Sequence, residues 1–184
     1  AGLWRVFCES NNQSSLAGSF GAEALELLSS DASSPEVLGR NCRNTEEIVT
    51  QTQLATGADL GVAMAGSGPP VTWKFFSSIE QLGATLDQWI SDLFNDGAVP
   101  GDVTILVCGT SLAQVMEALP RTRRSKISRI DPSIAEQWPS RQITISTVID
   151  FKGLENRHVA LVGVTDFSWS GPLRAASASA QTTA

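Results

Sequence analysis

The feature that most restricts the fold of this chain is an amphipathic stretch, residues 78–95, followed by a largely apolar stretch, residues 103–108. Apolar side chains recur in the first stretch at spacings of three and four, which predicts a helix with one apolar face. The second stretch, Val-Thr-Ile-Leu-Val-Cys, is typical of a buried strand. Together they predict a sheet covered by helices. The periodic positions are Ile79, Leu82, Leu86, Trp89, Ile90 and Leu93.

The same alternation of strand-like and helix-like stretches continues along the chain. Residues 143–149 are rich in β-branched residues and residues 159–164 form another apolar run, so both are expected to be strands. Ser111 is a good N-cap for a helix that reaches residue 119. Alternating strands and helices indicate βαβ units, so we expect an α/β fold with a mainly parallel sheet and helices on both faces. A helix start at 44–47 and an alternating strand over 71–76 complete the pattern.

Length and charge limit the classes of function. With 184 residues the chain supports one domain of ordinary size. Thirteen Lys and Arg against nineteen Asp and Glu give a net charge of −6, whereas proteins that bind nucleic acid by diffuse attraction are usually basic. A local groove stays open, and residues 121–129 contain a basic cluster whose alternative interpretation is a solvated loop.

The cysteines and the apolar runs bear on location. Cys8, Cys42 and Cys108 match no zinc or redox spacing, so we expect small buried hydrophobic side chains, no metal site and a cytoplasmic protein. Residues 159–164, among the longest apolar runs, are far shorter than a membrane span of about 20 residues. The chain opens without Met and directly into a strand-like run, so we expect a piece of a longer protein.

Chemistry is concentrated between the last two predicted strands. The strand at 143–149 leads through Thr147 into a turn that contains Lys152-Gly-Leu-Glu155. A hydroxyl group and a glycine at such a turn can offer hydrogen-bond donors to a phosphate, and a carboxylate can accept from a sugar hydroxyl. An ordinary βαβ crossover is the alternative.

This stretch resembles motif V of the superfamily 1 DNA helicases of the UvrD/Rep type. The resemblance implies that Thr147, Ile149 and Lys152 face the nucleic acid and that Gly153 and Glu155 face the nucleotide, with Glu155 at the ribose of ATP. The family often has a DNA-contacting histidine where this chain has Ile149.

Two segments nearer the N-terminus are similar to further helicase motifs. Leu38 to Ile48 resembles motif IV, whose arginine corresponds to Arg43 and would face the nucleotide phosphates. A guanidinium suits that role because it keeps its charge and donates in a fork. Residues 3–13 resemble motif III more loosely, with Gln13 as the γ-phosphate sensor.

The C-terminal residues 173–184 resemble motif VI, which supplies the arginine finger of the family. In this alignment Ser179 takes the place of the arginine and Arg174 that of an aromatic residue. A serine cannot stabilise charge on a transferring phosphoryl group. The tail is therefore either a degenerate motif VI or a flexible end.

The resemblance as a whole implies a RecA-like fold of the P-loop NTPase type. Residues 1–20 would be the end of a first motor domain and residues 21–184 the second motor domain. The sequence has no G-x-x-x-x-G-K-[ST] loop, so we expect ATP and Mg²⁺ only in the full-length protein and no ATPase activity from this chain alone. The expected partners are single-stranded or duplex DNA and the missing first domain, without a membrane. A non-catalytic interaction module derived from a helicase domain is the alternative.

Overall fold

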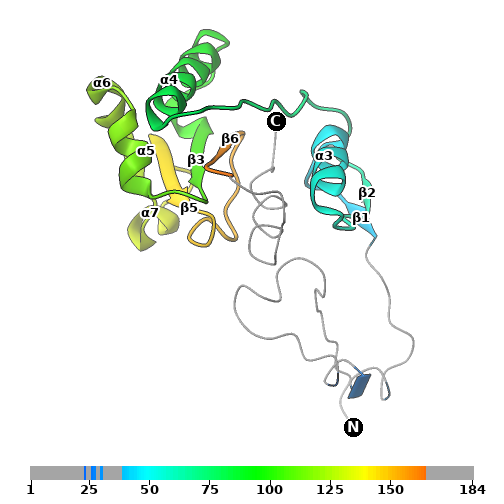
Figure 1. Ribbon diagram of the computed structural model, residues 1–184. Helices are drawn as coiled ribbons and strands as arrows, with labels where there is room; N and C mark the ends of the chain where they lie inside the picture. The colour runs from blue at the N-terminus through cyan, green and yellow to red at the C-terminus, as the bar shows by residue number, and fades with distance from the viewer. Residues whose placement is uncertain (1–22, 24–25, 28–29, 31–38, 165–184) are drawn as a thin grey trace.

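The computed structural model describes residues 23, 26–27, 30 and 39–164, which contain two parallel sheets and their helices (Figure 1). The larger sheet has four strands in the order β4-β5-β3-β6, and all three neighbouring pairs are parallel. The protein is therefore an α/β fold with parallel sheets. The strands are β3 (Val103–Val107), β4 (Ile127–Arg129), β5 (Ile143–Thr147) and β6 (His158–Val162).

The two longer helices that accompany the four-stranded sheet each begin after a serine that caps the helix N-terminus. The Ser78 side chain accepts a hydrogen bond from the backbone N–H of Gln81 at the start of α4, and Ser111 accepts from the backbone N–H of Gln114 at the start of α5. These bonds satisfy amides that the first turn leaves without a partner. The elements are α4 (Ile79–Asn95), η1 (Pro100–Asp102), α5 (Leu112–Ala118), α6 (Arg121–Arg124) and α7 (Pro132–Glu136).

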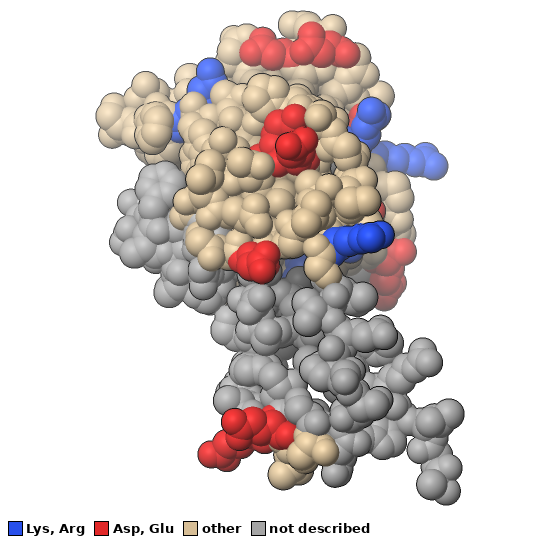
Figure 2. Space-filling model, turned by 90° about the vertical axis from the view of Figure 1, so that its right-hand side faces the viewer, with Lys and Arg blue, Asp and Glu red and all other residues tan. Residues whose placement is uncertain are grey.

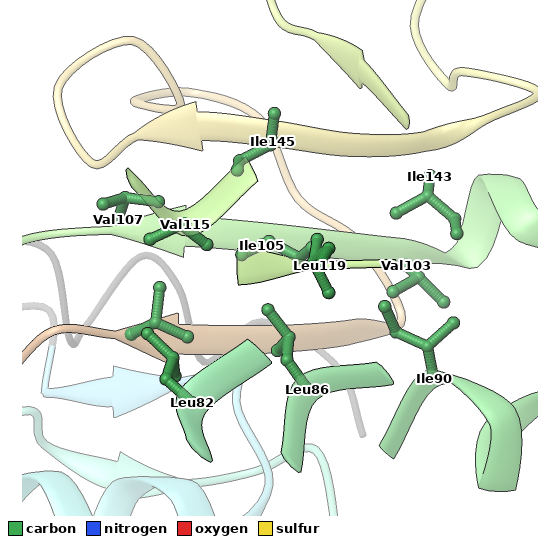
Figure 3. Close-up of a cluster of buried hydrophobic side chains, with 11 residues drawn as sticks. Leu82, Leu86, Ile90, Val103, Ile105, Val107, Val115, Leu119, Ile143 and Ile145 are labelled. Carbon is green, nitrogen blue, oxygen red and sulfur yellow. The ribbon is translucent and has the colours of Figure 1, made fainter. Parts of the chain in front are cut away.

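One face of the four-stranded sheet is covered by α4 and α5. Figure 3 shows Leu82, Leu86 and Ile90 of α4 directed toward the strands, where Ile105 is fully buried. The two helices approach closely at Gly83, since a Cβ atom there would overlap the backbone carbonyl of Ala118. Only a residue without a side chain allows this packing. Residues 79–164 are called the sheet body below.

The opposite face packs against shorter segments. Leu106 of β3 lies in a second buried cluster with Ile130 and Phe151, against which Trp138 also packs. Ile130 precedes α7 and Trp138 follows it, while Phe151 comes from the turn after β5. The helices are thus unevenly divided, with the two longer ones on one face.

The buried strands also carry a chain of polar contacts. The hydroxyl groups of Thr104 and Thr144 lie 2.7 Å apart on neighbouring strands. The Asn156 amide donates to the Thr104 hydroxyl and to the carbonyl oxygen of Gly101, each at 2.9 Å. Buried polar groups that are satisfied in this way favour one register over its alternatives. The start of β3 is therefore tied to the segment that enters β6.

Residues 39–64 form a small unit of their own, with β1 (Arg40–Asn41), α3 (Glu46–Thr56) and β2 (Val62–Ala63). Figure 1 shows it beside the sheet body, joined to α4 by an extended segment. Its buried apolar side chains include Ile48, Val49 and Ala58. The helix ends at Gly57, whose φ of 64° is in the left-handed region that favours glycine.

The structure confirms the helix expected over 78–95, the helix after Ser111, the helix start near 44–47, and strands at β3, β5 and β6. The strand expected over 71–76 is wrong, because these residues form no ladder with any strand that the structure describes. A period-two pattern needs a neighbouring strand to become a strand. The expectation of buried cysteines is wrong for Cys42, which is exposed, while Cys108 is half-buried. Cys8 and the expected strand at residues 3–8 lie outside the described residues.

Candidate functional site

Arg43 lies in the loop between β1 and α3, and the side chain of Asn41 shapes that loop. The side-chain Oδ1 of Asn41 accepts hydrogen bonds from the backbone N–H groups of Arg43, at 3.2 Å, and Asn44, at 2.9 Å. This Asx turn redirects the chain from the strand into the helix. The Arg43 side chain consequently points out of the small unit and stays exposed.

Thr147 ends β5 and starts the turn that carries the other candidate residues. Its hydroxyl donates to the Asp150 carboxylate at 2.8 Å and accepts from the Asp150 backbone N–H at 3.2 Å. The backbone N–H of Phe151 then donates to the Thr147 carbonyl. Gly153 follows with a φ of 87°. Residues with a Cβ atom adopt this backbone conformation only at a cost in free energy. The sequence thus produces a tight turn between the sheet and Glu155.

The backbone of this turn is anchored by contacts with other parts of the sheet body. Phe151 is fully buried and makes an edge contact with Trp138, with ring centroids 5.9 Å apart. The Trp138 indole N–H donates to the carbonyl oxygen of Glu155 at 3.0 Å. Asn156, the next residue, is tied to the start of β3. Glu155 therefore has a well-anchored backbone and an exposed carboxylate.

Arg43 and Glu155 meet although they are far apart in the sequence. Arg43 Nε lies 3.6 Å from Glu155 Oε2, and the two side chains are 57% and 60% exposed. A pair this loose and this exposed stabilises the fold by only about 0–1 kcal/mol. Both groups therefore remain available to a ligand. A guanidinium can donate to a phosphate, and a carboxylate can accept from a sugar hydroxyl.

The residues expected to face nucleic acid lie in the same turn. Ile149 is 62% exposed and Lys152 is also exposed. The Thr147 hydroxyl, in contrast, is half-buried and engaged with Asp150. An exposed isoleucine can make an apolar contact with a nucleic-acid strand, but its side chain cannot form a hydrogen bond. Gln13, Arg174 and Ser179 lie outside the described residues.

The charged surface gives little sign of a broad nucleic-acid track. Figure 2 shows carboxylates scattered over the described part of one face, with Lys and Arg side chains mainly toward its edges. Within the basic cluster, Arg123 is held by Asp87 at 2.6 Å and Ser91 at 2.8 Å and lies over the ring of Phe94. Arg123 therefore joins α6 to α4, and for this residue the cluster is structural.

His158, at the start of β6, does not belong to the candidate site, and its environment differs from that of the candidate residues. Burial lowers its pKa below the ordinary value of 6.5, while nearby Asp102 partly opposes the effect and Arg157 adds to it. Near neutral pH the ring is therefore uncharged. The lowered pKa of His158 is therefore a result of how β6 packs.

Sequence reasoning missed three residues that shape the site: Asp150, Trp138 and Asn156. The spacing Thr-x-x-Asp over 147–150 is a local signal for the turn and could have identified Asp150. Trp138 and Asn156 reach the site only through the tertiary fold, so the linear sequence contains no signal for them.

Neither a metal centre nor a relative identifies this site. Within residues 39–164 and the few described before them, no group of three or more His, Cys, Asp or Glu side chains gathers to hold a metal ion. None of the described helices is long and apolar enough to cross a bilayer. Comparison of the sequence with protein-family models and with curated proteins gave no match.

Proposed function

We propose that this chain is the second RecA-like motor domain of a UvrD/Rep-type superfamily 1 DNA helicase. The observation that carries the proposal is the approach of Arg43 Nε to within 3.6 Å of Glu155 Oε2. The two residues were assigned to one nucleotide site through separate motifs, and they meet although they belong to regions with separate sheets. The parallel sheet, with Thr147 at the carboxyl end of β5, also supports a RecA-like fold.

The residues fit a nucleotide that lies against the edge of this domain. Arg43 would donate to phosphate oxygens, the Glu155 carboxylate would accept from the ribose, and Gly153 would leave room for close approach. Gln13 belongs to the same nucleotide site in this proposal. No group of three or more described His, Cys, Asp or Glu side chains gathers to hold a metal ion, and in this proposal Mg²⁺ and the phosphate-binding loop belong to a first motor domain. When bound, ATP supplies the free energy that opens and closes the two domains.

Thr147, Ile149 and Lys152 would contact single-stranded DNA from the neighbouring turn. The chain alone would bind nucleotide weakly and hydrolyse none, because the phosphate-binding loop and Mg²⁺ would belong to the first motor domain. Hydrolysis of ATP by the pure 184-residue chain, stimulated by DNA, would contradict this proposal.

The decisive experiment measures DNA-stimulated ATPase activity of the full-length protein with Arg43→Ala. Loss of a preorganised donor at a phosphate lowers kcat by about a hundredfold or more. Arg40→Ala is the matched control, since Arg40 is an exposed arginine in adjacent β1. Equal activity of the Arg43 and Arg40 variants would refute the assignment of Arg43.

A non-catalytic interaction module with the same fold is the second candidate. Ile149, 62% exposed where the family often has histidine, favours it, as does the net charge of −6. In that case the full-length protein would hydrolyse no ATP with or without DNA, and Arg43→Ala would change only stability. Measuring the wild-type protein first separates the two candidates.

A further inference from the structure

A cavity of about 440 Å³ opens beside the carboxyl ends of β4 and β5. The cavity is half open to the surface, and its volume is within the range of small-molecule sites, which is enough for the ring of a nucleobase. The cavity is distinct from the Arg43–Glu155 pair, neither member of which lines it. The lining residues are Arg129, Ile130, Asp131, Ala135 and Asp150.

The lining combines two apolar residues with three charged ones. Ile130 is 4% exposed and Ala135 is half-buried, whereas Arg129, Asp131 and Asp150 are exposed. The apolar residues suit the face of a flat ring. The charged groups surround that surface and can form hydrogen bonds with the edges of such a ring.

The balance of charge selects among flat ligands. Two carboxylates against one guanidinium disfavour a phosphate inside the cavity and favour an uncharged ring with both donors and acceptors. Guanine presents the acceptors O6 and N7, which match the fork of an arginine. Its N1–H and N2–H groups are adjacent donors that one carboxylate can accept together. Among the DNA bases, guanine matches both kinds of group best.

The cavity shares a wall with the turn that the proposed function assigns to nucleic acid. Asp150, which lines the cavity, is joined to Thr147 by hydrogen bonds of 2.8 and 3.2 Å. A strand that passes Thr147 would therefore run along the cavity mouth. We propose that this cavity holds a guanine base of such a strand, with Arg129 at its acceptor edge and Asp131 or Asp150 at its donor edge. The inference rests on the proposed contact with a nucleic-acid strand.

Fluorescence anisotropy on the 184-residue chain tests the inference at low salt. The probes are labelled oligothymidylates of about twelve nucleotides, with and without one central deoxyguanosine. We expect the deoxyguanosine to tighten binding by roughly tenfold, as one good bidentate contact does. Equal affinity for the two probes would overturn the inference.

Two isosteric variants assign the preference to the cavity. Asp150→Asn and Asp131→Asn keep acceptors for Thr147 and for the Ile134 backbone N–H, but an amide cannot accept both guanine donors. We expect at least one variant to abolish the deoxyguanosine preference, measured as the ratio of the affinities of that variant for the two probes. Asp59→Asn is the control, because exposed Asp59 accepts from the backbone of Gly61 in the small unit and loses the same charge. A preference that survives in both cavity variants would overturn the inference.

A second arm distinguishes this inference from the proposed function. Guanosine is titrated into the chain while the methyl NMR signals of Ile130 and Ala135 are followed, with adenosine for comparison. If neither oligonucleotide binds but guanosine shifts these methyl groups selectively, the guanine site stands and the proposed strand contact fails. If the oligonucleotides do not bind and guanosine causes no selective shift, the guanine site is refuted as well.

Discussion

The sheet body and the small unit, the two regions that supply Glu155 and Arg43, differ in how their backbones are held. In the sheet body all five residues of β3 are buried, and its strands pair over three to five residues each. In the small unit β1 and β2 pair over two residues, and Leu54 and Val62 are 76% and 67% exposed. The small unit is therefore the less stable region.

This difference bears on the candidate site because the site spans both regions. Glu155 stands on a turn anchored by Trp138 and Asn156, whereas Arg43 stands on a loop shaped by Asn41 alone. Regions with few buried apolar contacts open locally at lower free energy than the core does. We expect a ligand to stabilise the Arg43 side more than the Glu155 side.

The largest effect is expected from truncating the centre of the sheet. Ile105→Ala removes a fully buried side chain and should lower the free energy of unfolding by about 2–5 kcal/mol. Ile48→Ala in α3 should instead speed hydrogen exchange of α3 while leaving the urea midpoint of the sheet body nearly unchanged. If both variants lower that midpoint equally, the two regions form one cooperative unit and the comparison fails.

Thiol labelling compares the regions in the native state. Burial raises the pKa of Cys108 from 9.0 to about 11, which leaves about a hundredth of the thiolate of an ordinary thiol at neutral pH. In a Cys8→Ser background, exposed Cys42 should react rapidly with a disulfide reagent and Cys108 about a hundredfold more slowly. Similar rates at the two thiols would show that the end of β3 is open.

A smaller change tests the packing of α4 on α5. Through helix propensity alone, Gly83→Ala would stabilise α4 by about 1 kcal/mol. The new methyl group, however, would overlap the backbone of Ala118. We expect a net loss of about 1–3 kcal/mol in the free energy of unfolding. Ala84→Gly on the exposed side of α4 is the control and should cost about 1 kcal/mol through propensity alone. A stabilised Gly83→Ala protein would contradict the close approach.

The smallest effect concerns pH and His158. Since burial lowers the pKa of His158 in the folded protein, the unfolded chain binds the proton more readily. Stability should therefore decrease as pH falls below 6.5, the ordinary pKa, and should be fully present above it. Urea midpoints between about pH 7.5 and about pH 5.5 measure this slope while Glu47 and Glu80, whose pKa values are lowered below 4.5, stay ionised. The variant His158→Gln should flatten the slope, and an unchanged slope would assign it to other groups.

Sequence patterns predicted the elements that supply most of the buried core. The helix α4 was predicted from its apolar spacing, and the strands β3, β5 and β6 were predicted from apolar or β-branched runs. All four elements pack against the same core. The three-residue β4 was missed, since Ile127-Ser-Arg129 follows a basic cluster and lacks a long apolar pattern. The 71–76 stretch shows the converse, a strand-like pattern that has no described strand beside it.

For the candidate site, the sequence predicted residue types more readily than neighbours. Arg43 and Glu155 were singled out by resemblance to helicase motifs, and spacing alone would not have paired them. The cavity between Arg129, Asp131 and Asp150 had no sequence signal, since these residues come from two separate crossovers. Proximity of this kind arises only when the strands are ordered β4-β5-β3-β6.

The two hydrogen bonds of the Asn156 amide have a consequence for the order of folding. They join this residue to Gly101 and Thr104, and β6 pairs with β3 across a similarly long intervening chain. Contacts between residues so distant in sequence close large loops and form slowly. We therefore expect docking of β6 to be a late event in folding. In that order of events, Glu155 of the candidate site would reach its native position only after β3 and β5 have paired.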